Sequence, residues 1–178
     1  MSASNSKTTV ECRKKGAIII TGYVCIGKTY FCKNINTEQQ HKFGRIVDLD
    51  SSNYSRDQFP ENYLQDIRRT ADKYAEEGCI ILVSTFPGVG PTLKQDGYYV
   101  AQVYPQNNPG TKSEWLRRLE LREKDGKESR LYQLVNHHWD EWSDEMETRD
   151  ISKSIRVSSN EYLSNVIDEI YQDFENST

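Results

Sequence analysis

The sequence has no long hydrophobic run, and none of its apolar stretches approaches the roughly 20 residues that a membrane-spanning helix needs. It also lacks an excess of one charge, because 23 basic residues stand against 27 acidic residues and the formal net charge is −4. No overall field therefore draws the chain to nucleic acid or to an anionic membrane. Small soluble ligands are the expected partners.

Cysteine is scarce, and its spacing carries no signature. The four cysteines (Cys12, Cys25, Cys32 and Cys79) form no C-x-x-C pair, and the three histidines have no ligand-like spacing with them. No secretory hydrophobic segment is visible either. We therefore expect plain thiols in a reduced compartment, with the protein in the cytoplasm.

The length of the chain indicates one domain. A protein of 178 residues can bury about 70% of its unfolded surface on folding, which is enough for a core without disulfides. Residues 1–15 mix Ser, Thr, Asn and Lys without periodicity and are expected to form a mobile leader. The folded domain is expected over residues 16–178.

One motif dominates the sequence. Residues 22–29 read Gly-Tyr-Val-Cys-Ile-Gly-Lys-Thr and match G-x-x-x-x-G-K-[ST], between a β-branched run at 17–21 and a segment at 29–33 that can continue as a helix. Two glycines let the backbone curl so that its N–H groups, with the start of the helix, surround phosphate oxygens. Lys28 would reach the β- and γ-phosphates, and the Thr29 hydroxyl would ligate Mg²⁺.

The residues expected to bind a nucleoside triphosphate are Gly22, Tyr23, Val24, Cys25, Ile26, Gly27, Lys28, Thr29 and Tyr30.

Strand and helix patterns alternate along the whole chain. Strands are expected at 17–21, 44–50, 79–85, 98–104 and 155–158, and helices at 29–33, 61–78, 92–95, 112–124, about 131–146 and from 160 onward. Residues 34–42 are expected to be a polar connector. The alternation predicts a three-layer α/β fold with a parallel sheet, right-handed crossovers and ligand loops at the carboxyl ends of the strands.

Two carboxylates end the second predicted strand. Asp48 and Asp50 are two residues apart in an extended segment, so both can project toward one side. One of them could hold Mg²⁺ through water, and the other could orient or deprotonate an acceptor hydroxyl. The alternative is ordinary turn and helix-cap chemistry in the Asp-Ser-Ser-Asn segment. The predicted third strand ends in Ser84 and Thr85 and offers no acid of its own.

Arginines gather on the helix after the fourth predicted strand. Arg118 and Arg122 are four residues apart and share a helix face, so they could contact a phosphoryl group during transfer from a mobile lid at about 111–130. Arg117 points about 100° away around the same helix. The alternative is a solvated face, because Glu114 and its neighbours can pair with these cations.

Trp139 and Trp142 lie on the broad apolar face of the next helix. They are expected in the core, with a base-stacking platform as the alternative.

The combination of residues 22–29, the Asp-Leu-Asp-Ser-Ser-Asn segment at 48–53, and Val-Tyr-Pro at 103–105 before an arginine helix resembles the P-loop nucleoside monophosphate kinase superfamily. More narrowly, it is similar to small nucleotide-kinase-like proteins common in bacteriophages. The resemblance implies a five-stranded parallel sheet in the order 2-3-1-4-5, an acceptor region after the second strand and a small helical lid after the fourth. The sequence departs from that pattern in the bulky residues 23–26.

The predicted function is a Mg²⁺- and ATP-dependent phosphotransferase whose acceptor is a nucleoside or a nucleoside monophosphate. Lys28, Asp50, Arg118 and Arg122 are the expected catalytic residues, and Thr29 and Asp48 the expected metal ligands. The alternatives are a kinase of another small hydroxylated metabolite and a nucleotide-binding regulatory module without turnover.

Overall fold

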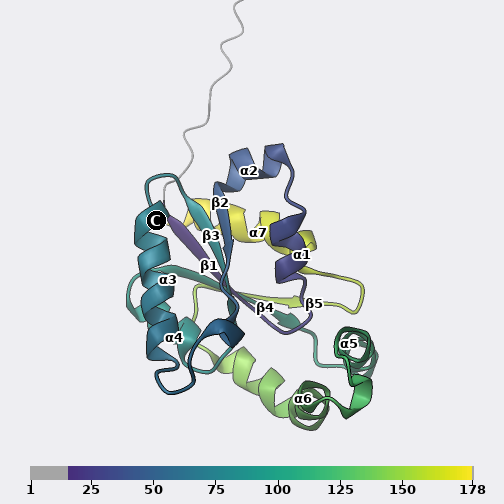
Figure 1. Cartoon of the computed structure of the whole chain (residues 1–178). Coiled ribbons are helices and arrows are strands. Elements are labelled where there is room, and N and C mark those ends of the chain that lie inside the picture. The colour runs from purple at the N-terminus through teal and green to yellow at the C-terminus, as the bar shows by residue number, and fades with distance from the viewer. Residues whose placement is uncertain (1–15, 178) are drawn as a thin grey trace, which may run out of the picture.

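The computed structural model describes residues 16–177, so the predicted leader lies outside the described residues. Five parallel strands form a single sheet in the order β2-β3-β1-β4-β5, which is the order that the family resemblance implied (Figure 1). The strands are β1 (Ala17–Gly22), β2 (Arg45–Asp48), β3 (Cys79–Ser84), β4 (Tyr99–Pro105) and β5 (Lys153–Val157). Every connection between consecutive strands contains at least one helix, as a parallel sheet requires.

Helices cover both faces of the sheet, which gives the three predicted layers (Figure 1). Side chains alternate along β1, so Ile18 and Ile20 enter one buried cluster and Ile19 enters the other. The first cluster includes residues of α1 (Lys28–Lys33), α2 (Thr37–Phe43), α5 (Pro109–Arg122), α6 (Arg130–Thr148) and α7 (Leu163–Asn176). The second is formed against α3 (Glu61–Tyr74) and α4 (Val89–Gln95).

The apolar spacing that predicted the long helices is also what buries them. Tyr63, Leu64, Ile67 and Ala71 of α3 recur every three to four residues, and all four are buried. In α7 the same spacing holds for buried Leu163, Val166, Ile167, Ile170 and Phe174. None of the helices in residues 16–177 is both long and apolar enough to cross a membrane.

The structure corrects the prediction that residues 34–42 are a connector, because α2 occupies most of this segment. The side chain of Asn36 accepts from the Gln39 N–H at 2.8 Å, and the Gln39 side chain accepts from the Asn36 N–H at 3.2 Å. This reciprocal capping starts the helix although its composition is polar. Pro105 is the last residue of β4 and pairs with Val157, so the strand does not stop before it.

The segment predicted to be a mobile lid is packed against the rest of the domain. Trp115 and Leu119 of α5 are fully buried, and the Trp115 Nε1–H donates to the Val24 carbonyl at 2.8 Å. A short turn of 3₁₀ helix, η2 (Gly126–Glu128), then leads into α6. Helices α5 and α6 lie below the carboxyl ends of the strands in Figure 1.

Candidate functional site

The loop of residues 22–29 connects β1 to α1, and its glycines are required by its geometry. Gly27 has a φ of 94°, in the left-handed region that side chains disfavour. A Cβ atom on Gly22 would lie 2.9 Å from Ile26 Cγ2 and 3.0 Å from Lys28 Cδ. Cys25 also takes a left-handed φ of 61°, so the loop keeps its curl even at a residue with a side chain.

The bulky residues of this loop fix it to three helices. Tyr23 is buried, and its ring meets those of Trp139 and Trp142 edge-on at centroid distances of 6.1 and 6.5 Å. The Val24 carbonyl accepts from α5, as described above. The Ile26 carbonyl accepts from the first N–H of α7 at 2.9 Å. The loop is therefore anchored by the ring of Tyr23 and by the backbone carbonyls of Val24 and Ile26.

Lys28 folds back onto its own loop. Its Nζ donates to the Gly22 carbonyl at 2.5 Å and to the Tyr23 carbonyl at 3.4 Å. Burial lowers the pKa of Lys28 to about 8, from an ordinary value of 10.5, and the negative charge of Asp48 offsets this only in part. An ammonium group held in this way gains from an anion that approaches the loop.

The two predicted carboxylates take different positions. Asp48 ends β2, and its Oδ2 accepts from the Thr29 hydroxyl at 2.7 Å. Asp50 lies beyond the strand and caps the 3₁₀ turn η1 (Ser51–Asn53) by accepting from the Ser52 N–H at 2.9 Å. That hydrogen bond holds the pKa of Asp50 below its ordinary value, so the side chain is a carboxylate at neutral pH.

Tyr63 holds the ends of β2 and β3 together, a role that the sequence did not reveal. Its hydroxyl donates to the Leu49 carbonyl at 2.8 Å and accepts from the Ser84 N–H at 3.0 Å. The sequence pattern identified Tyr63 only as one apolar position of a helix. The bridge fixes the backbone next to Asp50.

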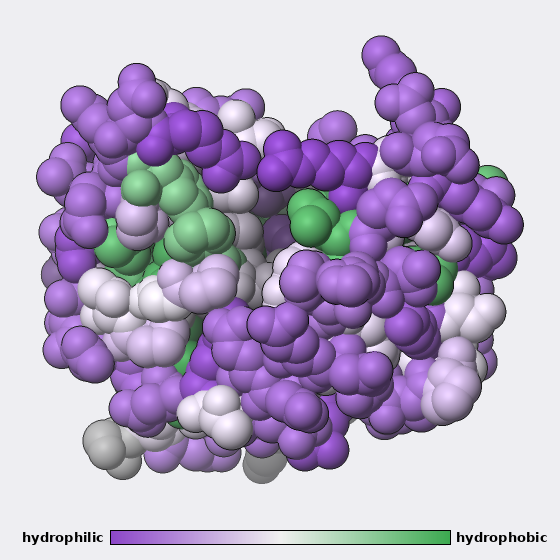
Figure 2. Space-filling model, turned by 90° about the horizontal axis from the view of Figure 1, so that it is seen from below, coloured by the Kyte–Doolittle hydropathy of each residue, from purple (hydrophilic) through white to green (hydrophobic). Residues whose placement is uncertain are grey.

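The loop of residues 22–29 and the two carboxylates line one cleft of about 890 Å³ at the carboxyl ends of the strands. Figure 2 views the molecule from below this edge of the sheet and shows hydrophobic surface beside a hollow that hydrophilic residues surround. The cleft brings together all nine predicted nucleotide-binding residues, Asp48, Asp50 and Arg122. Its other lining residues are Leu49, Ser51, Ser52, Arg56, Ser84, Thr85, Phe86, Pro87, Leu131, Leu134, Trp142, Glu145, Met146 and Arg149.

The structure separates the two arginines that the helix spacing placed together. Arg122 is exposed at the cleft, with its Nη1 4.0 Å from Cys25 Sγ. Arg118 is not part of the cleft lining, since its Nη2 donates to the Ser159 carbonyl at 2.5 Å. Its guanidinium also lies between the rings of Trp115 and Tyr162, 4.2 and 4.0 Å from their centroids. Arg118 was expected to be catalytic, but its side chain packs against Trp115 and Tyr162 and does not line the cleft.

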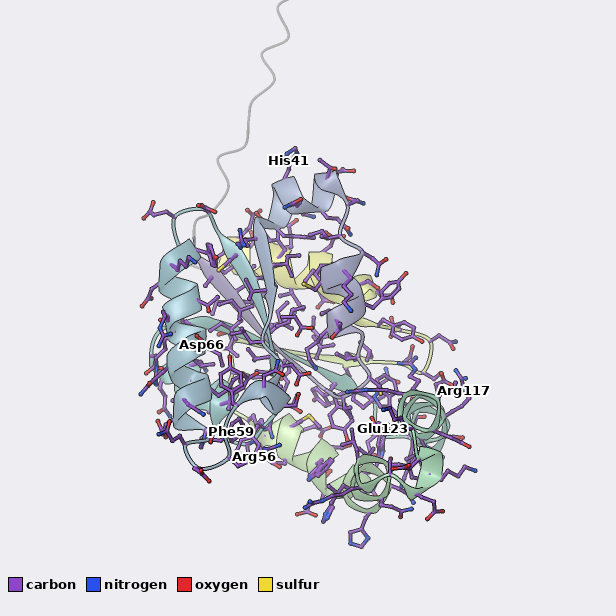
Figure 3. All side chains as sticks on the ribbon, viewed as in Figure 1. His41, Arg56, Phe59, Asp66, Arg117 and Glu123 are labelled. Atoms are coloured by element: carbon purple, nitrogen blue, oxygen red, sulfur yellow. The ribbon has the colours of Figure 1, made fainter. Side chains whose placement is uncertain are left out.

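Arg117 follows the alternative of a solvated face. It pairs with Glu114 through two hydrogen bonds of 2.8 Å and points to the outer side of α5 in Figure 3. The same Glu114 also accepts from Arg118 at 3.1 Å. The two cations together lower the pKa of Glu114 to about 2, with the Arg117 hydrogen bond as the main cause.

Two further charged residues of the cleft, Glu145 and Arg149, went unrecognised in the sequence. The Arg149 Nη1 donates to the Thr85 carbonyl at 2.8 Å, and its Nη2 donates to Glu145 at 2.8 Å. Their spacing of four residues was a weak signal, because it equally describes a surface ion pair at the end of a helix. The structure brings them to the end of β3, where the sequence lacks an acid.

The oxygen donors at Thr29 and Asp48 fit a Mg²⁺ ion. Magnesium takes oxygen ligands, and at nucleotide sites it is bound by one or two protein groups together with phosphates and water. A hydroxyl and a carboxylate 2.7 Å apart beside the loop satisfy this requirement. Within residues 16–177 no group of three or more His, Cys, Asp or Glu side chains forms a self-sufficient metal site.

Comparison with known proteins extends the description of the fold. No protein-family model matches the chain, and no curated protein matches it. Among solved structures, the chain is similar to the crystal structure of APE1195 with a TM-score of 0.51 and 15% identity, over 94% of this chain and 99% of that one. At this level of identity the likeness supports the α/β architecture alone.

Proposed function

We propose that this protein is a Mg²⁺- and ATP-dependent phosphotransferase that transfers the γ-phosphoryl group of ATP to a small acceptor, a nucleoside or nucleotide. The observation that carries the proposal is the meeting of Lys28, Thr29 and Asp48 around the curled loop at the head of a large cleft. A cation for phosphates and an oxygen pair for their metal ion are the two parts that a phosphoryl-transfer site needs first.

Lys28 would leave the Gly22 carbonyl and bind the β- and γ-phosphates. The buried ammonium ion is held by neutral carbonyls, so phosphate anions are better partners for it. Mg²⁺, held by Thr29 and Asp48 with the phosphates, would neutralise charge on the phosphate oxygens. Arg122 at the cleft can reach the charge that develops on the transferring group.

Asp50 is the group suited to receive the acceptor. An acceptor hydroxyl oxygen attacks the γ-phosphorus, a new P–O bond forms, and the bond to the β-phosphate oxygen breaks with its electron pair leaving on ADP. The hydroxyl proton passes to the Asp50 carboxylate, which the Ser52 N–H holds in place. Since Asp50 is ionised at neutral pH, it is ready to accept that proton.

The test is ADP release in the presence of Mg²⁺-ATP and a panel of acceptors, together with direct measurement of ATP binding. Lys28→Ala should lose ATP binding and acceptor-dependent ADP release while remaining folded. Lys33→Ala, at the exposed end of the same helix, is the matched control and should keep both. ATP binding by Lys28→Ala at wild-type affinity would contradict the proposal.

A nucleotide-binding module without turnover is a second candidate, and one observation favours it. Residues 23–26 fix the loop to α5, α6 and α7, which limits the adjustment that a loop can make during phosphoryl transfer. The two candidates differ in a single readout. A module binds ATP tightly and releases no additional ADP with any acceptor.

A further inference from the structure

We infer that the acceptor is a neutral alcohol with a flat apolar body and a polar edge, the class to which nucleosides belong, and not a phosphate monoester. This inference rests on the proposed function and specifies its acceptor. Three properties of the cleft carry it: an apolar wall, cations that are already engaged by other groups, and two buried polar atoms without partners.

The wall comes from one face of α6. Leu131, Leu134, Trp142 and Met146 line the cleft at helical spacing. Phe86 and Pro87 add apolar surface from the loop after β3, and Phe86 is 41% exposed. Covering apolar surface with a ligand removes it from water, which is favourable. A ligand with a flat apolar body is stabilised by contact with such a wall. A small polyol would instead lose hydrogen bonds to water that the wall does not replace.

The cations of the cleft leave little for an acceptor phosphate. Lys28 and Arg122 would serve the donor, and Arg149 is already paired with Glu145 and the Thr85 carbonyl. Arg56 is the cation that remains among the described lining residues, and its guanidinium lies over the Phe59 ring at 5.4 Å (Figure 3). One exposed arginine is a weak site for a dianion.

The carboxylates of the cleft also disfavour a phosphate monoester as the acceptor. Asp48, Asp50 and Glu145 all line this cleft, and a phosphate monoester brought to Asp50 would face like charges in a partly enclosed space. A neutral hydroxyl has no such cost. It also needs a base, which an acceptor phosphate does not, because the phosphate oxygens are already ionised. The presence of Asp50 at this place is therefore matched to an alcohol.

Two polar atoms of the lining residues require a partner. Ser84 Oγ and Arg149 Nε are buried and make no hydrogen bond within residues 16–177. The Arg149 side chain is only 9% exposed, so water does not replace the missing partner freely. An unpaired buried polar group is destabilising, so a ligand that pairs with it is favoured. Both residues line the cleft, and a carbonyl oxygen on the edge of a flat ligand, such as that of a nucleobase, is the kind of acceptor that either group lacks.

The experiment compares matched pairs of acceptors under Mg²⁺-ATP: each common nucleoside against its own 5′-monophosphate, with glycerol and myo-inositol as polyols. We expect at least one nucleoside to give a kcat/KM for ADP release ten times that of its monophosphate or more. Monophosphates or polyols that equal or exceed the nucleosides would overturn the inference. It is also overturned if ATP binds and no nucleoside accelerates ADP release.

Two pairs of variants test the wall and the charge separately. Leu134→Glu should raise the KM for the best nucleoside at least tenfold with ATP affinity unchanged, whereas Leu121→Glu, on a residue 73% exposed on α5 and outside the cleft lining, should change neither. Leu134→Ala replaces the glutamate variant if that variant fails to fold. Glu145→Gln frees the charge of Arg149 and should shift the preference at least threefold toward the monophosphate.

Equal KM values in Leu134→Ala and wild type, or an unchanged preference in Glu145→Gln, would count against the wall and the charge argument respectively. Failure of the proposed function is distinguished by ATP binding to the wild-type protein, which does not involve the acceptor. If Mg²⁺-ATP does not bind, the proposed function is wrong. If it binds and the acceptor comparison fails, the acceptor class alone is wrong.

Discussion

Replacement of Lys28 by methionine should make the protein more stable and remove its binding of ATP. Methionine has a similar length and no charge, so it keeps the volume of the side chain while it removes a buried ammonium group. The pKa of Lys28 is lowered to about 8, and burial is the main cause. The residue would then be retained for its ligand and not for folding.

The magnitude follows from the pKa. The difference between 10.5 and about 8 corresponds to roughly 3 kcal/mol at about 1.4 kcal/mol per pH unit. The variant loses the hydrogen bonds from Nζ to the Gly22 and Tyr23 carbonyls, which together offset about 1–2 kcal/mol. We therefore expect Lys28→Met to be about 1–2 kcal/mol more stable than wild type at pH 7.

The dependence on pH has a definite sign. The folded protein holds the Lys28 proton less tightly than the unfolded chain does, so the destabilisation is complete below pH 8 and declines between pH 8 and 10.5. At about pH 9.5 it should be roughly half its value at pH 7. The advantage of Lys28→Met over wild type should therefore shrink as the pH rises through this range.

Urea denaturation of wild type and Lys28→Met at several pH values between 7 and 9.5 measures this difference. Lys33→Met, at an exposed lysine on the same helix, should match wild type at every pH. If Lys28→Met is instead less stable than wild type throughout, the lysine is a structural support for the loop. Unchanged ATP affinity in that variant would refute the functional half of the argument.

Two further predictions concern the carboxylates and the arginines. Asp50→Asn should lower the acceptor-dependent kcat about 100-fold or more and leave the affinity for ATP intact, whereas Asp48→Asn should raise the Mg²⁺ concentration needed for half-maximal rate. Steady-state kinetics with a Mg²⁺ titration separates the two effects. Equal loss of ATP affinity in both variants would contradict these separate roles. Arg122→Ala should lower kcat more than it raises the KM for ATP. Arg118→Ala should lower the melting temperature by about 2–12 °C, because the Ser159 carbonyl loses its partner at a cost of about 1–3 kcal/mol and a domain of this size loses about 2–4 °C per kcal/mol. Arg117→Ala should match wild type in both melting temperature and kcat. A variant of Arg118 that melts like wild type but is inactive would restore it to the catalytic site.

The parallel α/β architecture was predictable because its signals are local, whereas the order of its strands was implied only by the family resemblance. The buried β-branched runs and the helical spacing of α3 and α7 repeat at the periods of their own elements, and parallel crossovers restrict how such elements can be arranged. The loop at 22–29 was predictable for the same reason, because its signal lies in residues that are adjacent in the sequence. Gly22 and Gly27 stand where a Cβ atom would collide or the backbone turns left-handed.

Helix α2 was missed for a physical reason that the sequence does contain. Its residues are polar, so it shows little apolar periodicity, and Phe43 is its only buried residue. The capping pair of Asn36 and Gln39 marks its start. An interpretation based on hydrophobic spacing gives such a pair too little weight.

The sequence by itself determined the α/β fold, the curled loop with Lys28 and Thr29, and the carboxylates that follow β2. Tertiary structure alone decided which arginine meets the cleft: Arg118 and Arg122 share a helix face, but a rise of about 6 Å along the axis brings one to the Ser159 carbonyl and the other to the cleft. It also decided the far wall, since residues 131–149 reach the loop from more than one hundred positions away. Contacts across such separations depend on how whole helices pack, and no local pattern records them.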